Sequence, residues 1–269
     1  MNEQSTITIT LGDQAENHAG MQILGKLVEA GQGFNLEDLK IIQRNLEEIG
    51  IVCELVPLEL NQKLDTIDTS IDIPEAAYVL IIRDGVNKIF ERCGEFSQRN
   101  LFEEHMVLEL DKQAFMKGRV VNKHARWNLC FDEAGQEPDY EAKKGRIVAY
   151  DDIPITKLFL SQITKYFGPK SENLKGEGNY YYDKTKCGIG FHGDSERRKV
   201  IGIRLGLGEG PPLHYQWFRE SKPVGDRIIL NLNGGDMYVM SEKAVGQDWK
   251  KRKTFTLRHA TGSQKFTTI

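Results

Sequence analysis

The sequence predicts an α+β protein whose C-terminal half is a β-sandwich or barrel. From residue 179 onward the chain consists of short segments rich in Val, Ile, Tyr and Phe, separated by Gly or Pro. Before residue 115, apolar strands alternate with amphipathic helical segments. The 269 residues, 39% hydrophobic and 28% charged, are enough for one large domain or a domain with an appendage.

The first 115 residues are expected to form a small α+β layer of unassigned role. Alternation with period two predicts its strands, and apolar residues three or four apart predict its helices. Asn35, followed three residues later by Asp38, is a capping box that begins the second helix. The expected elements are strands over 6–11, 51–58 and 77–83, helices over 21–28 and 35–49, and an ambiguous helical stretch over 96–116.

The remainder, residues 116–269, begins with a polar, loop-rich stretch and a helix over 156–167. The segments after residue 179 are β-branched or aromatic, with turn residues between them, which is typical of strands. The expected strands are 179–182, 188–192, 199–205, 213–219, 226–232, 236–240, 254–259 and 265–268.

Composition excludes several classes of protein. No apolar run reaches about 18 residues, so no membrane span is expected. The N-terminus lacks a basic segment followed by an apolar one, so we expect no signal peptide and a cytoplasmic or nuclear location. The net charge of −3 leaves a nucleic-acid partner dependent on a local basic patch. The cysteines are far apart and predict reduced thiols: Cys53, Cys93, Cys130 and Cys187.

One pattern points to metal chemistry. His192 and Asp194 are two residues apart on an expected strand, so their side chains project from the same face. With His259 they make the two-histidine, one-carboxylate set that binds non-haem Fe(II) and leaves coordination positions open. By itself the pair is more typical of a surface histidine beside a solvated aspartate.

The neighbouring motifs favour the metal interpretation. From Asn179 to the C-terminus the chain resembles the 2-oxoglutarate- and Fe(II)-dependent dioxygenases, and among them the AlkB-like branch. The order of the motifs carries the resemblance, which covers about a third of the chain. They are Asn179/Tyr181, His192/Asp194/Glu196, Ile203-Arg-Leu-Gly206, Gly235-Asp236 and His259.

The resemblance implies a double-stranded β-helix, or jelly roll, as the catalytic domain over residues 116–269. It implies Fe(II) held by His192, Asp194 and His259, and 2-oxoglutarate as the co-substrate, contacted by Asn179 and Tyr181. The implied oxidoreductase reaction consumes O2 and converts 2-oxoglutarate to succinate and CO2. The substrate is hydroxylated or oxidatively demethylated.

The family also uses a cation, beyond the second histidine, to bind the distal carboxylate of 2-oxoglutarate. Lys265 is the preferred candidate, because it follows His259 at a suitable distance. Arg252 and Arg258 imitate the family's arginine pair, but that alignment needs a histidine before residue 252, and none lies between residues 235 and 251. Arg258 remains a second candidate that faces inward or supports the last strand.

Substrate contacts are less defined. Glu196 occupies the position where AlkB-like enzymes keep an acid that contacts a flipped base. Arg126 and Trp127 form either a substrate-side wall or, with His124, an exposed loop. The basic runs 196–199 and 250–253 are either solvated or contact phosphates. His214 is expected to be a packed or pocket-lining residue rather than a ligand.

Three functions remain open on this basis. The first is an AlkB-like dioxygenase acting on a modified nucleic-acid base. The second is the same chemistry on a protein side chain or small metabolite, which the net acidic charge favours. The third is a catalytically silent jelly-roll binding protein. The sequence does not indicate an oligomeric state.

Overall fold

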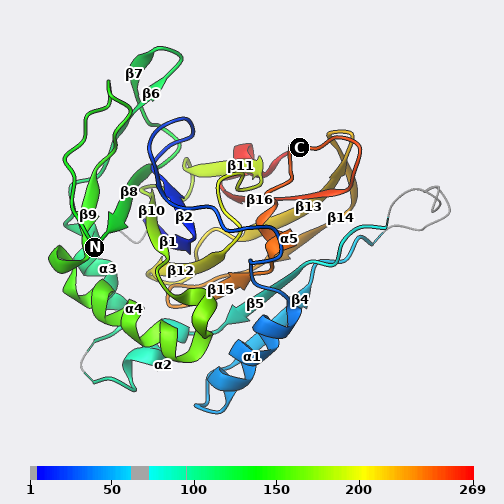
Figure 1. Ribbon diagram of the computed structural model, residues 1–269, viewed down its shortest axis with the longest axis horizontal. Helices are drawn as coiled ribbons and strands as arrows, with labels where there is room; N and C mark the ends of the chain where they lie inside the picture. Colours follow the sequence, from blue (N-terminus) through cyan, green and yellow to red (C-terminus); the bar gives the residue numbers. More distant parts are fainter. Residues whose placement is uncertain (1–4, 62–72, 95) are drawn as a thin grey trace.

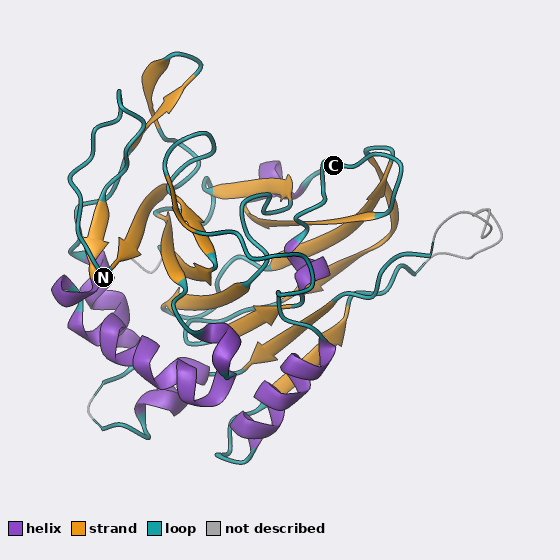
Figure 2. Ribbon diagram, in the orientation of Figure 1, coloured by secondary structure: helices purple, strands orange, loops and turns teal. Residues whose placement is uncertain are grey.

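A computed structural model gives the structure of residues 5–61, 73–94 and 96–269, in which two sheets dominate a mixed α/β fold (Figure 1). The large sheet has the strand order β4 (Cys53–Pro57), β5 (Tyr78–Ile82), β15 (Met237–Met240), β12 (Val200–Gly206), β1 (Thr6–Gly12), β10 (Lys175–Tyr181), β8 (Trp127–Asp132), β9 (Ile147–Ala149). The small sheet has the order β11 (Gly188–His192), β16 (Thr256–Gly262), β13 (Leu213–Arg219), β14 (Lys222–Leu230). Figure 2 shows the longer helices gathered along one side of the strands. The described strands form no closed barrel.

From β10 to β16 the chain passes repeatedly between the two sheets. Strands β10, β12 and β15 belong to the large sheet, whereas β11, β13, β14 and β16 belong to the small one. These seven elements confirm the strands predicted between residues 179 and 259. The eighth prediction, a strand over 265–268, is wrong, because residues Gln264–Thr267 form the short helix α6.

The first strand of the chain fills the gap between β10 and β12. β1 pairs antiparallel with both, and its Thr8 lies opposite Asn179 on one side and Arg204 on the other. With β1 in this place, the large sheet offers no edge there for a C-terminal strand. Strands β4 and β5 also extend this sheet through β15. The boundary expected near residue 115 therefore does not separate two independent units.

Two hairpins rise from the sheets. β2 (Gln14–Glu16) pairs with β3 (Ile23–Gly25), and β6 (Gln113–Met116) pairs with β7 (Arg119–Asn122). The predicted helix over 21–28 is therefore wrong. Gly20 and Gly25 adopt positive φ angles of 84° and 81°, which bend the chain just before the segment and within it. Leu24, one of the apolar residues of this segment, is instead buried against Ala15 of the neighbouring strand.

The four principal helices lie on the outer face of the large sheet, opposite the small sheet (Figure 1). The capping box of the first helix is confirmed, since Asn35 Oδ1 accepts from Asp38 N at 3.0 Å and Asp38 Oδ2 accepts from Asn35 N at 2.7 Å. The principal helices are α1 (Leu36–Glu47), α2 (Gly85–Phe90), α3 (Gln98–Met106) and α4 (Pro154–Phe167), with α5 (Glu242–Val245) and 3-10 turns at Tyr150–Asp152 and Pro169–Ser171.

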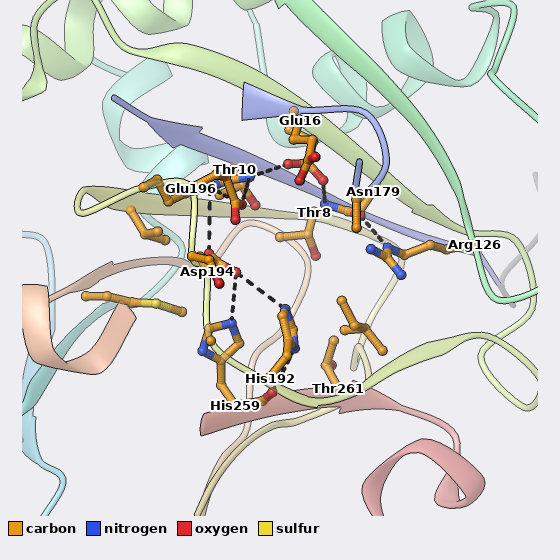
Figure 3. Close-up of a pocket in the computed structure, with 18 of the residues that line it drawn as sticks. Thr8, Thr10, Glu16, Arg126, Asn179, His192, Asp194, Glu196, His259 and Thr261 are labelled. Atoms are coloured by element: carbon orange, nitrogen blue, oxygen red, sulfur yellow. Dashed lines mark hydrogen bonds and ion pairs between the residues drawn. The ribbon is translucent and has the colours of Figure 1, made fainter. Parts of the chain in front are cut away.

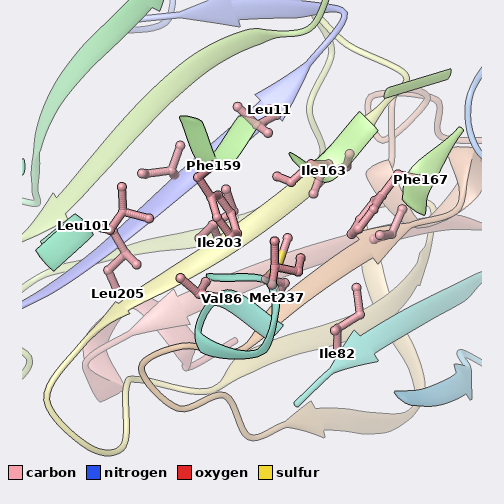
Figure 4. Close-up of a cluster of buried hydrophobic side chains, with 14 of the residues drawn as sticks. Leu11, Ile82, Val86, Leu101, Phe159, Ile163, Phe167, Ile203, Leu205 and Met237 are labelled. Carbon is pink, nitrogen blue, oxygen red and sulfur yellow. The ribbon is translucent and has the colours of Figure 1, made fainter. Parts of the chain in front are cut away.

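Strand β1 divides its side chains between two environments. Ile7, Ile9 and Leu11 are buried in the core beneath the helices, together with Phe159 and Ile203 (Figure 4). The intervening threonines face the other way, toward the small sheet. A second core, which includes Tyr215 and Trp217, fills part of the space between the sheets. The strand alternation thus separates an apolar layer from a polar cavity.

Two expectations from composition agree with the structure. In the part of the chain that is described, no helix has the length and apolar character to cross a membrane. All four cysteines are free, and Cys130 and Cys187 are buried.

A neutral histidine lies in the helical core. His105 is fully buried, with Nδ1 2.9 Å from the Tyr180 hydroxyl and Nε2 2.8 Å from Thr156 Oγ1. Burial lowers the pKa of His105 from its ordinary value of 6.5 to about 3. It is therefore a packing residue that remains uncharged in the folded protein at neutral pH.

This histidine predicts acid sensitivity of the fold. Below pH 6.5 the unfolded chain binds a proton at His105 that the folded chain does not accept. Its contribution to the free energy of unfolding is therefore complete above pH 6.5 and is lost as the pH falls toward 3. Between pH 7 and pH 5 we expect a loss of about 2 kcal/mol that His105→Gln abolishes. Urea denaturation at both pH values measures it, and an unchanged pH dependence in His105→Gln would contradict the expectation.

Candidate metal centre

Three potential ligands meet where β11 and β16 lie side by side. His192 ends β11, and His259 is its direct partner in the register of β16. Asp194 Oδ1 lies 3.4 Å from His192 Nε2 and 3.6 Å from His259 Nε2. All three ligand atoms lie within 4.8 Å of one another. Ligands about 2.1 Å from a shared ion and at right angles would be roughly 3 Å apart, so a small adjustment suffices to bind one cation.

Backbone carbonyl groups orient the first histidine. His192 Nδ1 lies 2.8 Å from the carbonyl oxygen of Gly190 and 3.1 Å from that of His259. Since a carbonyl oxygen only accepts hydrogen bonds, Nδ1 carries the proton and Nε2 keeps its lone pair. The atom that faces Asp194 is therefore the one able to bind a metal.

A glycine allows Asp194 to reach the site. A Cβ atom at Gly193 would lie 2.0 Å from the carbonyl oxygen of Gly246, so a larger residue would force the two segments apart. The Asp194 amide donates to Val245 O at 3.0 Å and secures this approach.

The electrostatics favour the metal-binding protonation states. Burial alone would raise the pKa of Asp194, but the positive charge of Arg197, together with the two neighbouring histidines, outweighs it and holds the pKa well below its ordinary value. Burial, together with the neighbouring His192, lowers the pKa of His259. An ionised carboxylate and a neutral imidazole are the forms that coordinate divalent metals.

The cluster opens onto a pocket of about 550 Å³ between the two sheets (Figure 3). The large sheet contributes side chains from β1, β10, β12 and β15, and the small sheet contributes side chains from β11, β13 and β16. This volume is in the range of small-molecule sites.

The deep end of the pocket carries an unpaired arginine. Arg204 is 1% exposed, and its Nε and Nη1 have no hydrogen-bond partner among the described residues. Thr8, its register partner on β1, has a buried hydroxyl that is also unpaired. Tyr181 and Tyr238 line the same region. Leaving a buried guanidinium unpaired is costly, so this end of the pocket is suited to an anionic ligand.

The outer wall is acidic. Arg197 is 3% exposed and its Nη2 donates to Glu177 Oε2 at 2.5 Å and to Glu196 Oε1 at 2.8 Å. Its Nε lies 3.7 Å from Asp194 Oδ2. Glu16 adds a further carboxylate from the β2–β3 hairpin. In Figure 3 Glu16 and Glu196 lie beyond Asp194 as seen from the two histidines.

Several residues expected at the site do line the pocket: Asn179, Tyr181, Glu196 and Arg126. The Asn179 side chain is largely engaged, however. Its Oδ1 accepts from Arg126 Nε at 2.6 Å and from Asn128 Nδ2 at 2.7 Å, and its Nδ2 donates to Glu177 Oε1 at 3.0 Å. Asn179 therefore has at most one N–H group free for a ligand.

Three other expected residues lie outside the pocket. Lys265 is exposed on α6, which is not the strand that its anchoring role required. Arg258 lies over the ring of Phe218, with 4.1 Å between the guanidinium carbon and the ring centre. Trp127 stacks on Tyr182 with ring centres 4.3 Å apart. The predictions that placed Lys265 and Arg258 at the co-substrate and Trp127 at the substrate do not fit this arrangement.

The remaining histidines and basic runs are peripheral to the cluster. His214 is buried on β13 but does not line the pocket, and His124 is exposed. Of the run 250–253, Lys250 alone borders the pocket, and its ammonium group lies 5.5 Å from the ring centre of Trp249.

The sequence interpretation did not assign Arg204, Thr8 or Glu16 to the site. Arg204 had a detectable signal, because it is the lone charge in the apolar strand VIGIRLG. Thr8 and Glu16 had none, since their position depends on β1 returning between strands formed far along the chain.

The fold and cluster define a β-rich α/β protein with a His-Asp-His group at a polar pocket. It belongs to a family with a viral member. The chain is 49% identical over 263 residues, covering 98% of both proteins, to the uncharacterized protein R156 of Acanthamoeba polyphaga mimivirus. No protein-family model matches the chain.

The cluster predicts a metal site that depends on its three side chains. Replacing Asp194 or His259 with alanine is expected to weaken Mn(II) or Fe(II) binding on the order of 100-fold or more, since ligand loss should exceed the effect of losing a supporting hydrogen bond. Isothermal titration calorimetry measures the affinities. His214→Asn, a buried histidine on the same sheet, serves as the control and should bind like the wild type. Equal affinity in all variants would exclude the site.

Proposed function

We propose that this protein is an Fe(II)- and 2-oxoglutarate-dependent dioxygenase, an oxidoreductase. The observation that carries the proposal is that the His-Asp-His cluster and a buried arginine without a hydrogen-bond partner line the same pocket. A metal site with open positions and a separate carboxylate-binding group are the two parts that this chemistry requires.

The fold is proposed to be a double-stranded β-helix completed by the N-terminus. Strands β10 to β16 pass between facing sheets, as in a jelly roll. The position beside β10 and β12 is filled by β1 instead of by a strand that follows β16. This arrangement accounts for the helical C-terminal segment at Gln264–Thr267.

The residues present fit both groups. His192 and His259 offer imidazole nitrogens, and Asp194 offers an ionised carboxylate, a donor set that suits Fe(II). Arg204 has unpaired nitrogens for a carboxylate, and Thr8 has an unpaired hydroxyl beside it. A guanidinium pairs with a carboxylate through two parallel hydrogen bonds, which Lys265 would not provide even if it faced the pocket.

When bound, Fe(II) and 2-oxoglutarate would supply the oxidising chemistry, with O2 consumed and succinate and CO2 released. The chain's own residues hold and orient the reactants. The buried carbonyl contacts of His192 fix its ring, and Arg197 keeps Asp194 ionised. Leu213, Met240 and the tyrosines at the deep end limit the access of water.

Uncoupled turnover tests the proposal directly. With Fe(II), 2-oxoglutarate and O2, the wild-type protein should form succinate even without its substrate. Asp194→Ala should reduce the rate on the order of 100-fold, since it removes a ligand. Mass spectrometry of succinate measures the rates, and Glu29→Gln, at an exposed site outside the pocket, is the control. Equal rates in wild type and Asp194→Ala would refute the dioxygenase assignment.

A second pair of variants tests the co-substrate site. Arg204→Met keeps most of the buried volume but removes the charge, so we expect 2-oxoglutarate affinity to fall at least tenfold, which is ~1.4 kcal/mol. Lys265→Ala should leave the affinity unchanged. Titration of 2-oxoglutarate into the Mn(II)-loaded protein measures both. The opposite ranking would restore Lys265 as the anchor.

A further inference from the structure

The hairpin β2–β3 brings an acid from the N-terminal region to the metal pocket. Glu16 is half-buried and lines the pocket near its mouth, where Ala19 and Gly20 are exposed. Its Oε1 accepts from the Gly20 amide at 2.7 Å, which holds the carboxylate in place. Among the described residues it forms no ion pair.

The other acids of the outer wall are already paired. Glu177 and Glu196 share Arg197, so two carboxylates use one guanidinium. Arg126 Nε donates a hydrogen bond to Asn179 Oδ1, and the Lys250 ammonium group lies over the ring of Trp249 at the rim of the pocket. Glu16 is therefore the acid of the outer wall that lacks a cationic partner among the described residues.

The surroundings of Glu16 disfavour its ionised form. Burial, followed by the charges of Glu196 and Glu177, raises the pKa of Glu16 from 4.5 to about 7. Ionising such a carboxylate costs free energy, and a bound cation would reduce that cost. The buried and unpaired Arg204 in the same cavity is an independent sign that the cavity receives a ligand.

We propose that Glu16, together with Glu196, binds a positively charged nitrogen of the substrate. The group is an ammonium or guanidinium on a flexible chain, as a basic amino-acid side chain carries. The pocket is then bipolar: Arg204 binds an anion at the deep end, Glu16 binds a cation at the mouth, and the metal cluster lines the same cavity. The assignment of this cation to a substrate rests on the proposed function. The binding of a cation by Glu16 and Glu196 does not.

The same charges disfavour a nucleic-acid substrate. Glu177 and Glu196 are paired with Arg197, but Glu16 is not, and its charge when ionised would repel a phosphate group near the metal cluster. Of the basic run 250–253, Lys250 alone borders the pocket. A phosphate backbone would have to avoid Glu16 and Glu196 to bring a base to His192.

Calorimetric titration of the full-length protein tests the inference. The probes are the Nα-acetyl methylamides of lysine, arginine, norleucine and glutamate, and a single-stranded oligonucleotide. At least one cationic amide should bind, and at least tenfold more tightly than the norleucine and glutamate amides. Glu16→Gln should weaken that binding at least tenfold, whereas Glu29→Gln should not change it. The lysine and arginine arms distinguish an ammonium from a guanidinium site.

A second measurement guards against a Glu16→Gln protein that does not fold. In the wild type, affinity for the cationic amide should fall as NaCl rises, and that for the norleucine amide should not. Equal binding of lysine, arginine and norleucine amides, no binding of either cation, or tight binding of the oligonucleotide alone would overturn the inference. The titration requires neither iron nor turnover, so its result is separate from that of the succinate assay.

Discussion

The insertion of β1 between β10 and β12 is the constraint on which the site depends. Its threonines face the pocket, whereas Ile7 and Ile9 are buried in the core beneath the helices. β1 therefore contributes side chains to both layers. The pairing sets Thr8 beside Arg204 and leads the chain directly into the hairpin that carries Glu16. Removing β1 would disrupt the large sheet and both ends of the pocket together.

The two buried arginines of the pocket differ in whether they have carboxylate partners. Arg197 is shared among Glu177, Glu196 and Asp194, and this sharing keeps the metal-facing carboxylate ionised. Arg204, by contrast, has no such partner. Buried charges are tolerated when they are paired, so the unpaired group marks the place where a ligand would complete the structure.

The sequence was enough to predict those parts of the fold and of the site that depend on local patterns. Strand alternation located seven strands of the C-terminal half. It did not place Asp194, which lies just past the end of β11 and is held there by the bond from its amide to Val245 O. It also could not place Arg204 at the pocket, since nothing in a strand pattern says which face borders a cavity. The helix expected over 21–28 failed because its glycines, rather than its apolar spacing, determine the backbone. The strand expected over 265–268 failed because β1 already occupied the position of the last strand.

The same topology has a consequence for how the protein is made. Thr6 pairs with Tyr181 and Gly206, which leave the ribosome much later than Thr6 does. The large sheet cannot close until β10, β12 and β15 have been synthesised, so β1 must remain unpaired until then. Folding dominated by such distant contacts is slow, and exposed strand edges invite aggregation, so chaperone assistance and slow refolding are expected for this chain.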